Sequence, residues 1–108
     1  MAYSTNEQPF VQMGDGRQVV TTAGTRVQLS ATSVKVKKVE ITSLPSNTNA
    51  IAVGGSTVVA AAGTETGKII YAQDSITIYV DNLTKIYIDS IVSGHGVTYI
   101  YYLWKNTF

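Results

Sequence analysis

The chain of 108 residues contains no cysteine, and leucine, glutamate, methionine and proline are scarce. Without cysteine it can have no disulfide scaffold, no thiol nucleophile and no cysteine zinc site. Eight Lys and Arg against seven Asp and Glu leave a formal charge of only +1. That is too little for an electrostatic hold on nucleic acid or on an anionic membrane. No apolar run approaches the roughly 20 residues that span a bilayer. We therefore expect neither nucleic acid nor a membrane as a partner.

What the chain has in abundance is β-branched and aromatic residues, which make up 47 of the 108. Such side chains fit a pleated sheet and lose rotamer freedom in a helix. The length suits one domain with one core. Short strand patterns alternate with turn signals at close spacing, which is typical of a sandwich or barrel. The sequence predicts an all-β fold, with a single antiparallel, jelly-roll-like β-sandwich over residues 17–108.

The first 16 residues differ from the rest because they are polar and end in Gly14-Asp15-Gly16. Their one apolar cluster is Pro9-Phe10-Val11, which is too small to order the segment by itself. We predict an extended N-terminal arm over residues 1–16, with Phe10 and Val11 as anchors on a neighbouring surface. A frayed terminus is the alternative.

A change of phase marks the region around Lys37-Lys38. Val34 and Val36 alternate with lysines, but Val39 and Ile41 resume in the opposite phase. Because side chains swap faces at every residue of a strand, this slip predicts a bulge, a corner or a move between sheets.

Two hairpins are predicted further along the chain. Gly54-Gly55 separates residues 50–53 from residues 56–59 and suits a two-residue turn. After a turn at Gln73-Asp74, the segments 76–80 and 86–88 alternate isoleucine with polar or aromatic residues. We expect them to pair as an antiparallel hairpin, with the isoleucines inward and Tyr79 and Tyr87 outward.

The segment 97–104 is apolar on both faces, with Ile100, Tyr102 and Trp104 on one of them. Such a strand is either central in its sandwich or covered by another subunit. We favour a subunit, because monomers seldom expose a large contiguous apolar patch. The candidate interface residues are Phe10, Val11, Tyr79, Tyr87, Ile100, Tyr102 and Trp104, and a homo-oligomer is expected.

Residues that could carry chemistry are few. His95 is the single histidine and sits between two glycines, so we expect a turn residue rather than a general base or metal ligand. The segment 63–68 resembles half of a phosphate loop but has the wrong glycine spacing. Asp74, Asp81 and Asp89 could meet around calcium, yet turn aspartates usually bond to local backbone. No catalytic residue, metal or cofactor is expected.

Five segments follow one another along the chain in a recognisable order. They are Gly24-Thr25-Arg26-Val27-Gln28-Leu29-Ser30, Val39-Glu40-Ile41, Asn47-Thr48-Asn49, Ile51-Ala52-Val53-Gly54-Gly55, and residues 75–88, which include Val80-Asp81-Asn82-Leu83-Thr84-Lys85-Ile86-Tyr87. Together they resemble the small β-sandwich structural proteins of tailed bacteriophages. The resemblance covers roughly residues 20–103 on an element-by-element comparison of strand signals.

This resemblance implies a virion component, and we expect a capsid decoration or cement protein bound to the major capsid protein or other virion proteins. It also implies a trimer ahead of a dimer. A head–tail or fibre-associated accessory protein stays open. So does a carbohydrate-binding module, which would stack sugars on Tyr79, Tyr87, Tyr102 or Trp104. A small β-sandwich enzyme is the third class, and the missing acid–base partners count against it.

Overall fold

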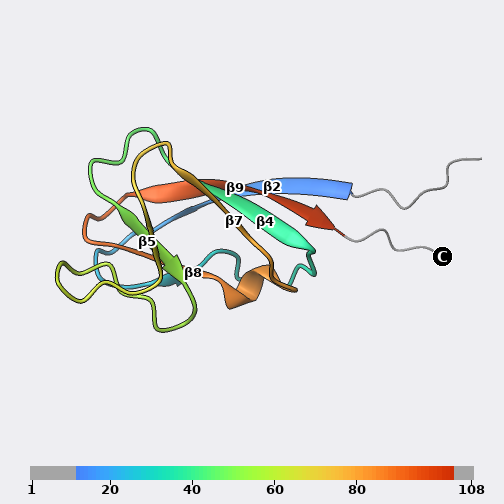
Figure 1. Cartoon of the computed structure of the whole chain (residues 1–108), viewed down its shortest axis with the longest axis horizontal. Coiled ribbons are helices and arrows are strands. Elements are labelled where there is room, and N and C mark those ends of the chain that lie inside the picture. The colour runs from blue at the N-terminus through green and yellow to red at the C-terminus, as the bar shows by residue number, and fades with distance from the viewer. Residues whose placement is uncertain (1–11, 104–108) are drawn as a thin grey trace, which may run out of the picture.

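The computed structural model describes residues 12–103, which form two packed antiparallel sheets (Figure 1). The elements of this range, in chain order, are β2 (Gln12–Val19), β3 (Val27–Gln28), β4 (Lys38–Ser43), β5 (Ile51–Gly54), β6 (Lys68–Ile70), β7 (Ser75–Ile78), the 3-10 helix η1 (Leu83–Lys85), β8 (Tyr87–Ser90) and β9 (Gly96–Leu103). The predicted all-β class is confirmed. Within residues 12–103, no helix has the length and apolar character needed to cross a membrane.

Each sheet has four strands. The first sheet has the order β2-β9-β4-β7, and the second has the order β3-β8-β5-β6. In the first sheet, the longest strands, β2 and β9, pair over eight residues from Gln12 opposite Leu103 to Val19 opposite Gly96. Apart from β5 and β6, strands that pair are not consecutive along the chain, and the chain crosses repeatedly between the two layers.

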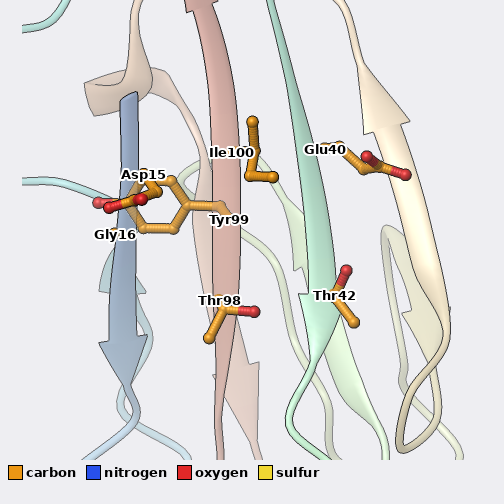
Figure 2. A pocket seen from close by; sticks show the side chains of 7 residues that line it. All are labelled: Asp15, Gly16, Glu40, Thr42, Thr98, Tyr99 and Ile100. Carbon is orange, nitrogen blue, oxygen red and sulfur yellow. The ribbon is translucent and has the colours of Figure 1, made fainter. Parts of the chain in front are cut away.

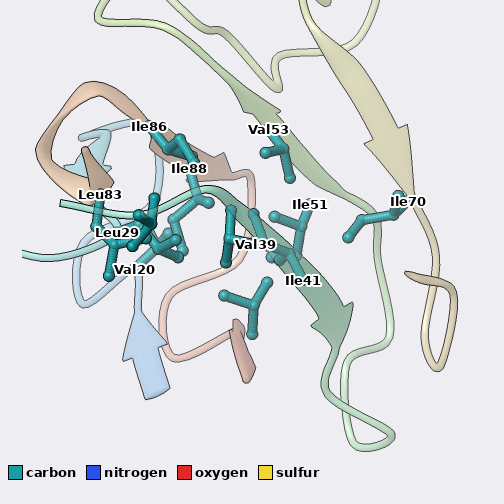
Figure 3. Close-up of a cluster of buried hydrophobic side chains, with 12 residues drawn as sticks. Val20, Leu29, Val39, Ile41, Ile51, Val53, Ile70, Leu83, Ile86 and Ile88 are labelled. Atoms are coloured by element: carbon teal, nitrogen blue, oxygen red, sulfur yellow. The ribbon is translucent and has the colours of Figure 1, made fainter. Parts of the chain in front are cut away.

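The core lies between the sheets and is built by alternation along the strands (Figure 3). In β4, Val39 and Ile41 are buried, while Lys38, Glu40 and Thr42 face outward. The fully buried branched side chains come from both layers and from η1, as expected where two sheets share an interior. They are Val20, Leu29, Val36, Val39, Ile41, Ile51, Val53, Leu83, Ile88 and Val97.

The predicted break at Lys37-Lys38 lies where β4 begins, at the end of the stretch in which the chain passes from β3 of the second sheet to β4 of the first. Before it, Lys35 bridges to Asn82 and the Val36 N–H donates to the Asp81 carbonyl, outside both sheets. Val36 and Val39 are both buried although they are three residues apart, so the side-chain phase has slipped.

The predicted arm is wrong over residues 12–16. These residues belong to β2 and pair with β9. Their polar, glycine-rich composition concealed the strand, because the inward side chains missing at Gly14 and Gly16 are replaced by rings from β9. A Cβ atom at either glycine would lie within 2.4 Å of the ring of Tyr101 or Tyr99. Residues 1–11, which include Phe10 and Val11, lie outside the described range.

Both predicted hairpins are wrong. After Gly55 the chain does not return as a strand, and β5 instead pairs with β6 and β8. Likewise, β7 pairs with β4 in the first sheet, whereas β8 pairs with β3 and β5 in the second. Isoleucines face inward whether two strands pair side by side or face each other across the core, so alternation alone could not separate these arrangements.

The segment between β7 and β8 shows how the chain crosses between the layers. Asn82 caps η1, and its Oδ1 accepts hydrogen bonds from the N–H groups of Val34 and Thr84 at 3.2 and 3.1 Å. Its Nδ2 donates to Ser33 Oγ at 2.8 Å. These bonds secure a crossing where the sequence had predicted a hairpin turn.

Candidate interaction surface

Strand β9 is central in the first sheet, between β2 and β4. This was one of the two explanations for its apolar faces. However, strand pairing covers only the edges of β9 and leaves its outer face open. Ile100 is 41% exposed on that face, and Tyr102 is half-buried. A partner that covered the outer face of β9 would therefore also cover the outer face of its neighbours in the first sheet.

We call the outward-facing residues of the first sheet, with Tyr79 just after β7, the open face. The pairing registers arrange them in three rows across the strands. The rows are Met13, Tyr102 and Lys38 with Tyr79 beyond them; Asp15, Ile100, Glu40 and Thr77; and Arg17, Thr98, Thr42 and Ser75.

The first row is aromatic and apolar around one positive charge. The Lys38 ammonium lies 5.0 Å from the ring centroid of Tyr102 and 5.9 Å from that of Tyr79, within the range of cation–π attraction. Tyr79 is 74% exposed and Met13 is 65% exposed. This row offers flat aromatic surface and a flexible thioether, both common at protein interfaces.

The second row contains a hollow of the open face (Figure 2). It is a groove of about 290 Å³. Residues of β2, β9 and β4 line it: Asp15, Gly16, Glu40, Thr42, Thr98, Tyr99 and Ile100. β2 and β4 lie two strand spacings apart, about 10 Å. The carboxylates of Asp15 and Glu40 therefore stand on opposite sides of the apolar Ile100.

Tyr99 lies beneath this groove, on the inward side of β9. Burial raises the pKa of its phenol, and the nearby Tyr101 and Asp15 raise it further. The rings of Tyr99 and Tyr101 are 6.2 Å apart and tilted by 32°. Their contact with the two glycines of β2 ties the edge strand to the core without inward side chains from β2 at those positions.

The third row is polar and partly satisfied by its own contacts. Thr42 Oγ1 and Ser75 Oγ share a hydrogen bond of 2.7 Å across β4 and β7. Arg17 and Thr98 are exposed at the β2 side of the row.

The predicted interface residues separate into three groups. Tyr79, Ile100 and Tyr102 come together on the open face. Tyr87 does not join them, because it lies in β8 of the second sheet, half-buried opposite Gln28 and Gly54. Phe10, Val11 and Trp104 fall outside residues 12–103. Sequence reasoning missed Met13, Asp15, Lys38 and Glu40, and their alternation identifies a face only once the strand register is known.

None of the residues considered for chemistry belongs to the three rows of the open face. His95 Nε2 accepts a hydrogen bond from the Thr48 N–H at 2.9 Å. Asp74 accepts one from the Tyr71 N–H. Asp81 forms an ion pair of 2.9 Å with Lys85, whose hydrogen bond lowers the pKa of Asp81. Within residues 12–103 no three His, Asp or Glu side chains group where they could hold a metal ion.

Asp89 has a different setting, since it is only 3% exposed. Its Oδ2 accepts a hydrogen bond from the Ala60 N–H at 2.9 Å, and its Oδ1 has no hydrogen-bond partner among the described residues. Asp89 thereby holds the segment after β5 against the second sheet.

Comparison with protein-family models, curated proteins and solved structures gives no match.

Proposed function

We propose that this chain is a non-enzymatic structural protein of a bacteriophage virion, built as a jelly-roll-like sandwich. In this proposal it decorates the capsid and contacts the major capsid protein or another virion protein through the open face. In this proposal the chain also forms a homo-oligomer. The nearest alternative is that the chain is an accessory protein at the head–tail junction or at a fibre.

The observation that carries the proposal is the exposure of Tyr79, Met13 and Ile100 on one continuous sheet face. Aromatic residues and methionine are enriched at interfaces, and apolar patches with polar surroundings mark interaction sites. The resemblance of residues 20–103 to phage structural proteins supplies the kind of partner.

The test has two stages. Mass spectrometry of purified particles from a culture that produces the chain should detect it at a fixed ratio to the major capsid protein. Tyr79→Ser and Ile100→Ser should then weaken binding of the purified chain to particles that lack it. Tyr71→Ser is the matched control, because Tyr71 is 63% exposed but lies outside the open face. Absence of the chain from washed particles would contradict the proposal.

A carbohydrate-binding module is the second candidate, and the exposed ring of Tyr79 favours it. Tyr79 and Tyr102 lie on either side of Lys38 and present aromatic surface that could stack on a sugar. A glycan array separates the two functions. Binding that is lost in Tyr79→Ser but kept in Tyr71→Ser would support the module.

A further inference from the structure

β2 is an edge strand of eight residues, and within residues 12–103 only β9 pairs with it. The Val20 N–H donates to the His95 carbonyl at 2.8 Å, just beyond the last paired position of β2. Because hydrogen-bonded and non-hydrogen-bonded pairs alternate in an antiparallel ladder, the even-numbered residues of β2 bond to β9. The backbone groups of Met13, Asp15 and Arg17 therefore point away from the sheet. An edge of this length is a template for another strand.

The side chains at this edge carry opposite charges at successive outward positions. Asp15 and Arg17 are both exposed and lie on the same face of β2, with Gly16 between them. If a second β2 pairs antiparallel about a two-fold axis at Gly16, each Asp15 faces the Arg17 of the other copy. The neighbouring two-fold registers place Asp15 opposite Asp15, or Arg17 opposite Arg17. Like charges directly opposite destabilise a strand pair, whereas opposite charges stabilise it.

Gly16 also suits the centre of such a pair on the inward side. The Tyr99 ring occupies the place of a Gly16 side chain, with Cζ and Oη 2.4 Å from where a Cβ would be. Tyr99 thus reaches across β2 toward the open edge. In the two-fold arrangement the Tyr99 rings of the two copies lie on either side of the axis, which adds an aromatic contact to the two ion pairs.

We propose that β2 pairs antiparallel with β2 of a second copy, centred on Gly16, to form a dimer with one continuous eight-stranded sheet. The charge pattern of β2 complements itself, so the occupant of this edge is the same chain. The open faces of the two copies then lie side by side in a single surface. This inference concerns a different surface from the proposed function and does not depend on a virion partner.

The first test is sedimentation velocity of the full chain over a concentration series. The native chain should sediment as a dimer that dissociates on dilution. Asp15→Arg and Arg17→Asp each place like charges opposite one another twice, and each should raise the dimer dissociation constant about tenfold. The double variant Asp15→Arg/Arg17→Asp exchanges the charges and should restore the dimer. Glu40→Arg is the matched control, because Glu40 shares the open face but lies on β4, away from the edge.

Hydrogen exchange provides the second measurement. The amides of Met13, Asp15 and Arg17 should be protected in the dimer and should exchange rapidly in Asp15→Arg. The amide of Val19 is less informative, because it already donates to Gln18 Oε1 at 3.0 Å.

Several results would overturn the proposal. One is a monomer at every concentration. Another is a trimer, since a two-fold edge closes after two copies. The third is a double variant that folds but stays monomeric.

Protection of the amides of Met13, Asp15 and Arg17 in a chain that sediments as a monomer would also overturn the proposal, because residues of the same chain would then cover the edge. Loss of the dimer in Glu40→Arg would move the interface from the edge of β2 to the open face. None of these outcomes bears on whether the chain is found in particles.

Discussion

The outer faces of the two sheets differ, although the sheets share one core. On the second sheet the segment after β5 lies across the strands. Val58 is buried against Gly54, Arg26 Nε donates to the Val58 carbonyl at 2.7 Å, and the Ala60 N–H bonds to Asp89. On the first sheet no described segment lies over β9 and β4, and Ile100 remains 41% exposed.

The same kind of position therefore has opposite surroundings in the two layers. Ala52 on β5 and Ile100 on β9 both point outward from a central strand, yet Ala52 is 0% exposed. Ala52 lies under the segment after β5 that contains Val58 and Ala60, here called the covering segment, whereas Ile100 faces water. The chain thus uses its own residues to close one sheet, while the apolar side chains of the other remain available to a partner.

Aspartate placed at position 52 or at position 100 should give the largest difference in the free energy of unfolding. Ala52→Asp buries a carboxylate opposite Asp89 and should cost more than about 3 kcal/mol of the free energy of unfolding. Ile100→Asp also places a carboxylate beside others, between those of Asp15 and Glu40, but this carboxylate is exposed to water. It should cost about 1 kcal/mol or less. Urea unfolding followed by circular dichroism measures both. Equal losses would mean that the two faces are equally covered.

The second prediction concerns Gly67, where an added side chain would push against the covering segment. Gly67 has a φ of 81°, and an added Cβ would lie 2.4 Å from the Val53 carbonyl oxygen and 2.9 Å from Val58 Cγ2. Gly67→Ala should cost about 2–3 kcal/mol, since a strained backbone and a backbone clash combine. The control is Gly63→Ala, which has a similar φ of 85° but open space around the added Cβ. It should cost about 1 kcal/mol from conformation alone. If thermal unfolding shows the same loss of stability for both variants, the covering segment does not pack closely against Gly67.

The sequence revealed these faces only in part. The inward sets, such as Val39 with Ile41 and Ile86 with Ile88, follow from alternation and are buried as expected. The break at Lys37-Lys38 follows from the same rule. Alternation describes one strand at a time, however, and does not say which strands pair or which face a loop will cover.

Two misses have a common physical cause. The strand β2 was predicted as an arm because its stability comes from backbone bonds to β9 and from the rings of Tyr99 and Tyr101 over its glycines. The segment after Gly55 was predicted as a strand, but its contacts run to Asp89 and Arg26, which are distant in sequence. Tertiary contacts override local preference in both places.

The third prediction uses pH to compare the two tyrosine environments of the first sheet. The pKa of Tyr99 is raised in the folded chain, chiefly by burial. Its contribution to stability is therefore complete below pH 10 and should be lost as the pH rises from about 10 through the folded pKa. The unfolded chain releases the phenol proton first, so unfolding becomes easier at high pH. Tyr99→Phe should reduce this dependence in urea unfolding between pH 9 and pH 11.5. Tyr79→Phe, which removes a phenol on the open face, is the control, and equal effects of the two variants would contradict the assignment to Tyr99.

The smallest effect is expected for Lys38, whose ammonium lies between Tyr79 and Tyr102 on the open face. Lys38→Met keeps the aliphatic stem and removes the charge, so it isolates the cation–π attraction from packing. We expect a loss of about 0.5 kcal/mol, because such contacts are weak at partly exposed sites. Lys38→Arg should retain most of the native stability. A loss above about 2 kcal/mol in Lys38→Met would mean that Lys38 is buried by something that covers the open face, and the contrast between the two sheets would then fail. A small loss instead means that this row of side chains contributes little to folding, which leaves its contacts free for a partner.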